Sequence, residues 1–159
     1  MTKPWLNLSI VVGLFFMLAP PALADFQAGL EAADRGDYPT AVKEFQLSAE
    51  RGDVKARYNL GVMYQLGLGV PQDDQEAVRW YRLAAEQGDA SAQFKLGVMY
   101  DKGKGVLKDY VLAHLWMNLA AAKGMKGAVK ARDLLEEMMT PAQLAEAQRL
   151  AREWKANRK

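Results

Sequence analysis

The feature that most constrains this chain of 159 residues is an internal repeat. Residues 53–88 and 89–124 align without a gap and are identical at 17 of 36 positions, including the run Leu-Gly-Val-Met-Tyr that begins at Leu60 and again at Leu96. Self-similarity at a period of 20–50 residues is typical of stacked repeat proteins, in which no unit buries its apolar face alone. The repeat therefore predicts a stacked-repeat architecture, although it names no partner.

Each unit is predicted to hold two helices. Over residues 54–65, Ala56, Leu60, Met63 and their repeat counterparts are spaced by three and four, which defines one apolar helical face. The second half, residues 74–87, has the same periodicity. Asp73 stands where an N-cap is needed, and Glu76 is placed to close a capping box. Glycines at the end of each unit are predicted to stop the second helix in a left-handed residue.

Glycines also recur inside the unit. Gly61, repeated as Gly97, falls within a predicted helix, where glycine costs about 1 kcal/mol relative to alanine. Its recurrence suggests that another helix passes too close for a side chain. Gly67 and Gly69, repeated 36 residues later, predict a tight turn between helices. A dinucleotide loop is not favoured, since it needs a preceding strand and a third glycine.

The joint pattern is specific. An alanine, Leu-Gly, a tyrosine, two spaced glycines, an aspartate, a tryptophan, an alanine pair and a final glycine occupy residues 56–88 and recur at 92–124. This pattern resembles the Sel-1-like repeat family, relatives of tetratricopeptide repeats, although the usual tyrosine after the tryptophan, Tyr81, is Met117 in the second copy. The resemblance implies an all-α, right-handed superhelix of helix pairs that serves as a protein-binding scaffold, and it implies no chemistry.

The rest of the chain is divided around these two full repeats, 53–88 and 89–124. Residues 25–52 are predicted to form a degenerate first repeat without the glycine loop, with helices over 26–34 and 40–50. After residue 124 the repeat decays, and residues 125–159 are predicted to be C-terminal capping helices, the last beginning at a Thr140-Pro141 capping box. The expected total is about eight helices and no strand, in one domain.

Residues 1–24 are predicted to be a signal peptide. Lys3 precedes an apolar core over residues 6–18, and Ala22-Leu23-Ala24 is a cleavage motif, so cleavage is expected after Ala24. The apolar core is shorter than a typical membrane-spanning helix of about 20 residues, and an uncleaved anchor is the alternative. The chain is therefore expected to be periplasmic or secreted. It has no cysteine, which excludes a lipid-bearing cysteine and disulfides.

Charge is divided unevenly along the chain. Residues 25–94 contain 7 basic and 12 acidic side chains, whereas residues 95–159 contain 13 basic and 7 acidic ones. A solvated surface is the simple interpretation. A dipolar module is the other, with its basic end meeting an acidic partner or its own acidic end head to tail. Nucleic acid is not expected as a partner of an exported protein.

No residue pattern points to catalysis, a cofactor or a metal site. His114 is the single histidine, and because its counterpart is Val78 we expect a plain surface or groove residue. Ser48 and Ser91 lie in no nucleophile motif, and no metal-ligand cluster or phosphate loop is present. Relatives linked to penicillin binding and β-lactam hydrolysis have a cysteine pair in each repeat, which is missing here. The sequence therefore predicts a protein that is not an enzyme.

The predicted function is a protein-interaction scaffold, adaptor or regulator in the bacterial envelope. The alternatives are a cell-wall-active or β-lactam hydrolase and a carbohydrate-binding accessory protein. In helix pairs of this type the first helices line the concave surface, so we expect partner contacts from two rows in one groove, with Arg79 and Arg82 on the convex side. The rows consist of Lys55, Asn59, Val62 and Gln65, then Ser91, Lys95, Val98 and Asp101.

Overall fold

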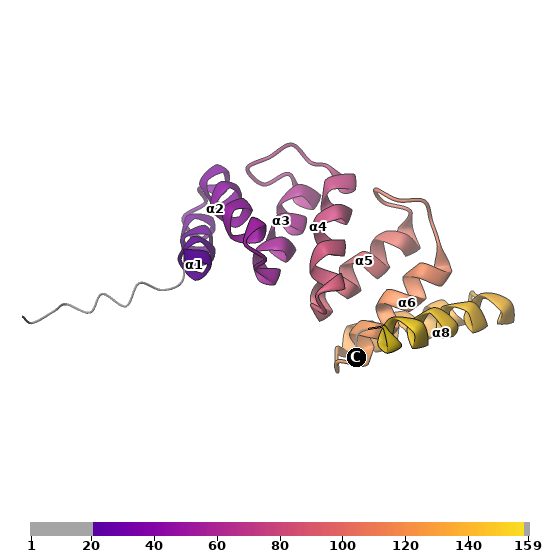
Figure 1. Cartoon of the computed structure of the whole chain (residues 1–159). Coiled ribbons are helices and arrows are strands. Elements are labelled where there is room, and N and C mark those ends of the chain that lie inside the picture. The colour runs from indigo at the N-terminus through magenta and orange to yellow at the C-terminus, as the bar shows by residue number, and fades with distance from the viewer. Residues whose placement is uncertain (1–20, 158–159) are drawn as a thin grey trace, which may run out of the picture.

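The computed structural model describes residues 21–157 of the chain. Over this range it contains eight α-helices and no strand, as predicted. Figure 1 shows the helices following one another along an arc. They are α1 (Pro21–Asp34), α2 (Tyr38–Glu50), α3 (Val54–Leu66), α4 (Asp74–Glu86), α5 (Ala90–Lys102), α6 (Tyr110–Ala121), α7 (Lys126–Glu136) and α8 (Pro141–Ala156).

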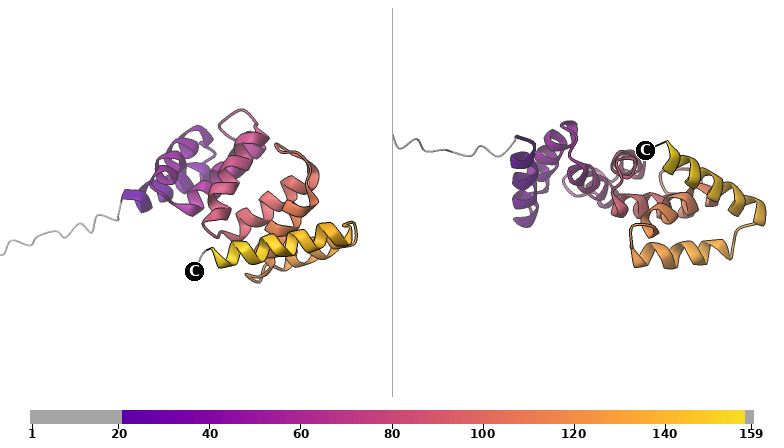
Figure 2. Two further views of the ribbon diagram at one scale, coloured as in Figure 1. Left: turned by 45° about the vertical axis from the view of Figure 1, so that its right-hand side comes forward. Right: turned by 60° about the horizontal axis from the view of Figure 1, so that its bottom comes forward.

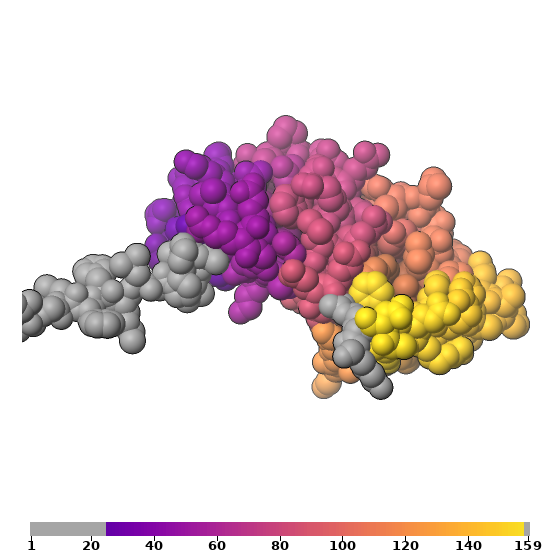
Figure 3. Space-filling view, viewed as in Figure 1, coloured from indigo at the N-terminus to yellow at the C-terminus, as the bar shows by residue number. Residues whose placement is uncertain are grey.

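The first six helices form three packed pairs, α1 with α2, α3 with α4, and α5 with α6. The second helix of each pair also packs against the first helix of the next, so that the pairs build a solenoid. Figure 3 shows these pairs as one continuous body. The two predicted repeats thus each fold into one helix pair plus the turn that follows it.

Aspartates start five of the six helices of these pairs, α2 to α6. Each accepts a backbone N–H in the first turn, which satisfies one of the donors that a helix start leaves unpaired. The capping residues are Asp37, Asp53, Asp73, Asp89 and Asp109. The predicted capping box at Asp73 forms only by half, because its backbone N–H donates instead to the carbonyl of Tyr64, at 2.9 Å. Gly67 and Gly88, with φ of 68° and 95°, end α3 and α4 in left-handed residues.

Two helices near the N-terminal end begin earlier than the sequence indicates. α2 begins at Tyr38 and not at Thr40, because Asp37 caps it and Pro39 fits its first turn. α1 begins at Pro21 and continues through the predicted cleavage position at Ala24. The rest of the predicted signal peptide, residues 1–20, lies outside the described residues, and its cleavage stays a prediction.

Glycines inside the first helices accept large side chains from their partner helices. A Cβ on Gly61 would lie 2.5 Å from the ring of Tyr81, and one on Gly97 would lie 2.8 Å from Cγ of Met117. The predicted close approach is confirmed at both sites, but at Gly61 the neighbour is a ring and not a backbone. Gly29 meets Phe45 in the same way, so the degenerate first repeat keeps this contact.

The second glycine of each turn joins successive pairs. A Cβ on Gly69 would lie 2.4 Å from the backbone of Tyr38, and one on Gly105 would lie 2.2 Å from the carbonyl oxygen of Asp74. Each glycine loop therefore rests on the first turn of the preceding pair's second helix. The sequence predicted a turn here but not this contact between repeats.

The C-terminal helices close the stack around α6. Figure 2 shows α7 and α8 on different sides of α6, and both pack against it. The predicted capping box of α8 is confirmed, since Thr140 and Gln143 each accept the other's backbone N–H. Trp154 of α8 meets Trp116 edge-on, with ring centroids 5.0 Å apart. Trp80 and Trp116 are both buried, as their recurrence in the repeat predicts.

Candidate partner-binding face

Two depressions lie between successive first helices. One is bordered by α1 and α3, the other by α5 and α7. Four of the eight predicted contact residues line them: Asn59 and Val62 in the first, Val98 and Asp101 in the second. Each row borders a different one of these two depressions, and the expected sharing of one wider groove by both rows stays a prediction.

The first depression has a volume of about 150 Å³ and is almost entirely apolar. It lies between α1 and α3, and Phe45 of α2, which is buried, also lines it. Asn59 contributes the one side-chain amide of the lining. Its lining is Leu30, Ala33, Tyr38, Phe45, Asn59, Val62, Met63 and Leu68.

The second depression, of about 290 Å³, has an unusually exposed apolar rim. Leu134 and Met138 are 53% and 56% exposed and line it together with Val98. Asp101 and Lys102 place one charge of each sign at its edge. Large apolar side chains at this exposure, gathered in one hollow, are typical of an interaction surface.

Leu134 and Met138 were not among the predicted contact residues. Leu135, which is 2% exposed, marks the core side of α7. Leu134 lies next to it off that side, and Met138, four residues further on, lies in the turn that follows α7. A spacing of four between apolar residues off the core face was the signal that could have found them.

Gln65 is not free to recognise a partner. Its Oε1 accepts a hydrogen bond of 2.9 Å from the hydroxyl of Tyr81, whose side chain is fully buried. Burial, reinforced by Tyr58 and Asp74, raises the pKa of the Tyr81 phenol well above its ordinary value. The phenol therefore stays protonated as a donor, and Gln65 belongs to the internal packing of the pair α3–α4.

The remaining predicted contact residues border neither depression. Lys55 is exposed, while Ser91 and Lys95 are half-buried. The two arginines expected on the convex side are also engaged. Arg82 donates to the hydroxyl of Tyr100 at 2.7 Å, and Arg79 bonds Glu76 and covers the ring of Trp80.

His114 is not the surface residue that the sequence suggested. It is 1% exposed, and its Nε2 lies 2.7 Å from Oε1 of Glu136 on α7. Its counterpart Val78 is buried as well, so the repeat keeps this position in the core whatever residue occupies it. The histidine therefore ties α6 to α7 and faces neither depression.

The described part contains no group of three or more histidine, aspartate or glutamate side chains placed to hold a metal ion. No helix in the same range is both long and apolar enough to cross a bilayer.

Comparisons with known proteins agree on the repeat. The profile of the Sel1 repeat matches residues 54–89 and 90–125. Two curated relatives, both described as DAP3-binding cell death enhancer 1, from Rattus norvegicus and Mus musculus, are 43% identical over 49 residues. That stretch covers 31% of this chain and 10% of each relative.

Two solved structures are similar over more of the chain. A protective antigen of uropathogenic Escherichia coli with an SLR fold superposes with a TM-score of 0.79 at 34% identity, covering 84% of this chain and 29% of that one. A Sel1 repeat protein from Oxalobacter formigenes superposes with a TM-score of 0.66 at 34% identity, covering 69% of this chain and 45% of that one.

The chain thus spans less than half the length of these relatives. Its two matched repeats, its packed helix pairs and its glycine contacts between pairs nevertheless all agree with one repeat architecture. Residues 54–125 are therefore two Sel1 repeats, in a structure similar to solved SLR proteins.

Proposed function

We propose that this protein is a non-enzymatic scaffold that binds another protein through the depressions between its first helices. The observation that carries the proposal is the exposed pair Leu134 and Met138 at the rim of the second depression. Exposing two large apolar side chains beside a hollow is unfavourable in water unless a partner covers them.

The chemistry of the depressions favours a helix or extended segment as the occupant. Both hollows are mainly apolar and carry few polar groups, which suits alternate apolar side chains of one segment. The polar group differs between the two depressions: the first has the neutral amide of Asn59, and the second has the carboxylate of Asp101. A segment that reaches both depressions would meet an amide at one and a carboxylate at the other.

We also propose that the protein acts in the bacterial envelope, after export directed by residues 1–24. Support comes from the order of a basic residue, an apolar run and small residues in that segment. An adaptor or regulator role fits such a compact repeat module. The chain's partner would then be an envelope or secreted protein.

The test uses two exposed leucines that differ in location. Leu134→Glu places a charge at the rim of the second depression, and Leu107→Glu places the same charge at a residue that is 91% exposed in the loop before α6. A photo-reactive residue at Met138 should cross-link one partner in cells, for identification by mass spectrometry. Leu134→Glu should lower that cross-linking at least about tenfold, because a buried unpaired charge is costly.

Leu107→Glu should leave the cross-link unchanged, and both variants should keep the wild-type melting temperature. Equal loss with both leucine variants, or cross-linking that survives Leu134→Glu, would place the partner elsewhere and reject this surface.

A further inference from the structure

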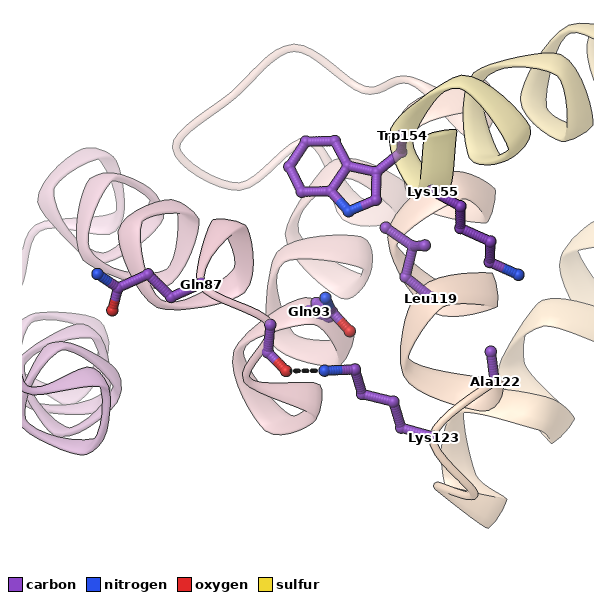
Figure 4. A pocket seen from close by; sticks show the side chains of 8 residues that line it. Gln87, Gln93, Leu119, Ala122, Lys123, Trp154 and Lys155 are labelled. Carbon is purple, nitrogen blue, oxygen red and sulfur yellow. Dashed lines mark hydrogen bonds between the residues drawn. The ribbon is translucent and has the colours of Figure 1, made fainter. Parts of the chain in front are cut away.

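A third depression lies away from both hollows of the partner-binding face, where the turn after α4 and the C-terminal ends of α6 and α8 come together (Figure 4). Its volume is about 370 Å³. We propose that it binds a carboxylate whose neighbouring carbon carries an N–H group. The C-terminal residue of a peptide and a free N-acylated amino acid share this chemistry. The residues that carry the argument are Gln93, Leu119, Lys123, Trp154 and Lys155.

The charge of the pocket favours an anion. Among residues 21–157, Lys123 and Lys155 are the only charged residues that line it. Nζ of Lys123 donates to the carbonyl oxygen of Gly88 (Figure 4). Because an ammonium group has three donors, two of them remain for a carboxylate, while Lys155 adds a second positive charge from α8.

Gln93 provides an acceptor that has no donor. Its side chain is 2% exposed, and Nε2 donates to the carbonyl of Ala85 at 3.1 Å. This bond fixes the orientation of the amide, because a carbonyl oxygen accepts and cannot donate. Oε1 is then buried with no hydrogen-bond partner among the described residues. A ligand N–H would supply the missing donor.

The preceding repeat shows that the fold itself does not require this acceptor. Arg57 stands 36 residues before Gln93 and donates its Nε to the carbonyl of Ala49, the counterpart of Ala85. Both residues therefore supply the same structural bond between pairs. Only Gln93 adds an oxygen, and it does so in the pocket that also contains Lys123.

The apolar side of the pocket indicates that the ligand also carries an apolar group. Leu119 and the indole of Trp154 line the pocket, and Trp154 is held by its edge-on contact with Trp116. The volume is at the small end of ligand pockets, about 300–1,000 Å³. An anion, an N–H and an apolar side chain on one carbon are what a terminal amino-acid residue presents.

The test compares five probes, with N-acetylglucosamine as the sugar control, by NMR titration of the purified protein, following the side-chain amide of Gln93 and the indole of Trp154. N-acetyl-leucine should bind at least about tenfold more tightly than N-acetyl-leucinamide, which lacks the carboxylate, and than 4-methylpentanoate, which lacks the N–H. Tighter binding of the tripeptide Ala-Ala-Leu than of N-acetyl-leucine would identify peptide ends as the source; the reverse order would identify free N-acylated amino acids.

Variants assign the roles. Lys123→Gln should weaken N-acetyl-leucine binding about tenfold, whereas Lys104→Gln, an exposed lysine in the turn after α5, should not. Gln93→Arg keeps the bond to Ala85 as in the preceding repeat, and it should abolish the preference for N-acetyl-leucine over 4-methylpentanoate. Equal affinity for N-acetyl-leucine and its amide in the wild type, equal weakening by both lysine variants, or tighter binding of N-acetylglucosamine would overturn the proposal.

Discussion

Single residues in the first helices set how closely each pair packs. Gly29, Gly61 and Gly97 each lie under a large side chain of the second helix, and the three contacts differ in the residue they accept. A phenylalanine ring, a tyrosine ring and a methionine fill the same place in successive pairs. The glycine is thus required by the partner side chain, which explains why a poor helix former recurs inside a helix.

Gly61→Ala should destabilise the protein by up to about 2 kcal/mol, the cost of overpacking less the helix propensity gained. The new methyl group would lie 2.5 Å from the buried ring of Tyr81, and overpacking of about 1–3 kcal/mol outweighs the helix propensity gained, about 1 kcal/mol. Urea denaturation monitored by circular dichroism gives the difference. Gly127→Ala is the matched control, because Gly127 lies in α7 with nothing within 4 Å of its Cβ position. It should be neutral or slightly stabilising, and a loss equal to that of Gly61→Ala would refute the contact.

His114 and Gln65 illustrate residues whose roles depend on distant partners. Glu136, which pairs with His114, is 22 residues away, and Tyr81, which pairs with Gln65, is 16 residues away. Helical periodicity places a residue on a face of its own helix. It does not say which polar atom of another helix will reach that face, so neither contact could be found from the sequence.

At the scale of elements, the glycine loops hold one helix pair against the next. Gly105 has φ of 68°, and a Cβ there would lie 2.2 Å from the carbonyl oxygen of Asp74 in the preceding pair. Two constraints therefore act on the same residue, the left-handed backbone and the approach of another backbone. A backbone oxygen cannot rotate away as the end of a side chain can.

Gly105→Ala should therefore lower the free energy of unfolding by more than the left-handed backbone at this position alone would cause. Alanine in this backbone region costs about 1–2 kcal/mol, and the clash should add about 1–3 kcal/mol. Gly124→Ala isolates the first cost, because Gly124 has φ of 84° but nothing within 4 Å of its Cβ position. Thermal and urea unfolding should show the larger loss for Gly105→Ala. Equal losses would mean that the loop does not support the contact between pairs.

At the scale of the whole molecule, the end of the stack differs from its repeats. α7 and α8 both pack on α6, and the basic half of the chain supplies both lysines of the pocket beside α8. The exposed rim of α7 and this pocket lie on different sides of α6. One protein could therefore hold a partner on its first helices and a small carboxylate at its end.

Export is expected to remove residues 1–24 from the protein. The protein recovered from the bacterial envelope fraction should have an intact mass that begins at Asp25, after cleavage behind Ala24. Mass spectrometry of the tagged protein measures this directly. A full-length product retained in the membrane fraction would instead support an uncleaved anchor.

The sequence by itself determined the repeat, the helix pairs and the residues that begin and end their helices, because these depend on local spacing and on capping groups within a few residues. It also placed Val62 and Val98 on the face that opens into the depressions. Only the tertiary structure decided that Gln65 and His114 are used internally, that Leu134 and Met138 stay exposed, and that Gln93 has an unpaired oxygen. These outcomes depend on where neighbouring helices cross, since packing between pairs fixes which side chains are covered and which polar atoms meet.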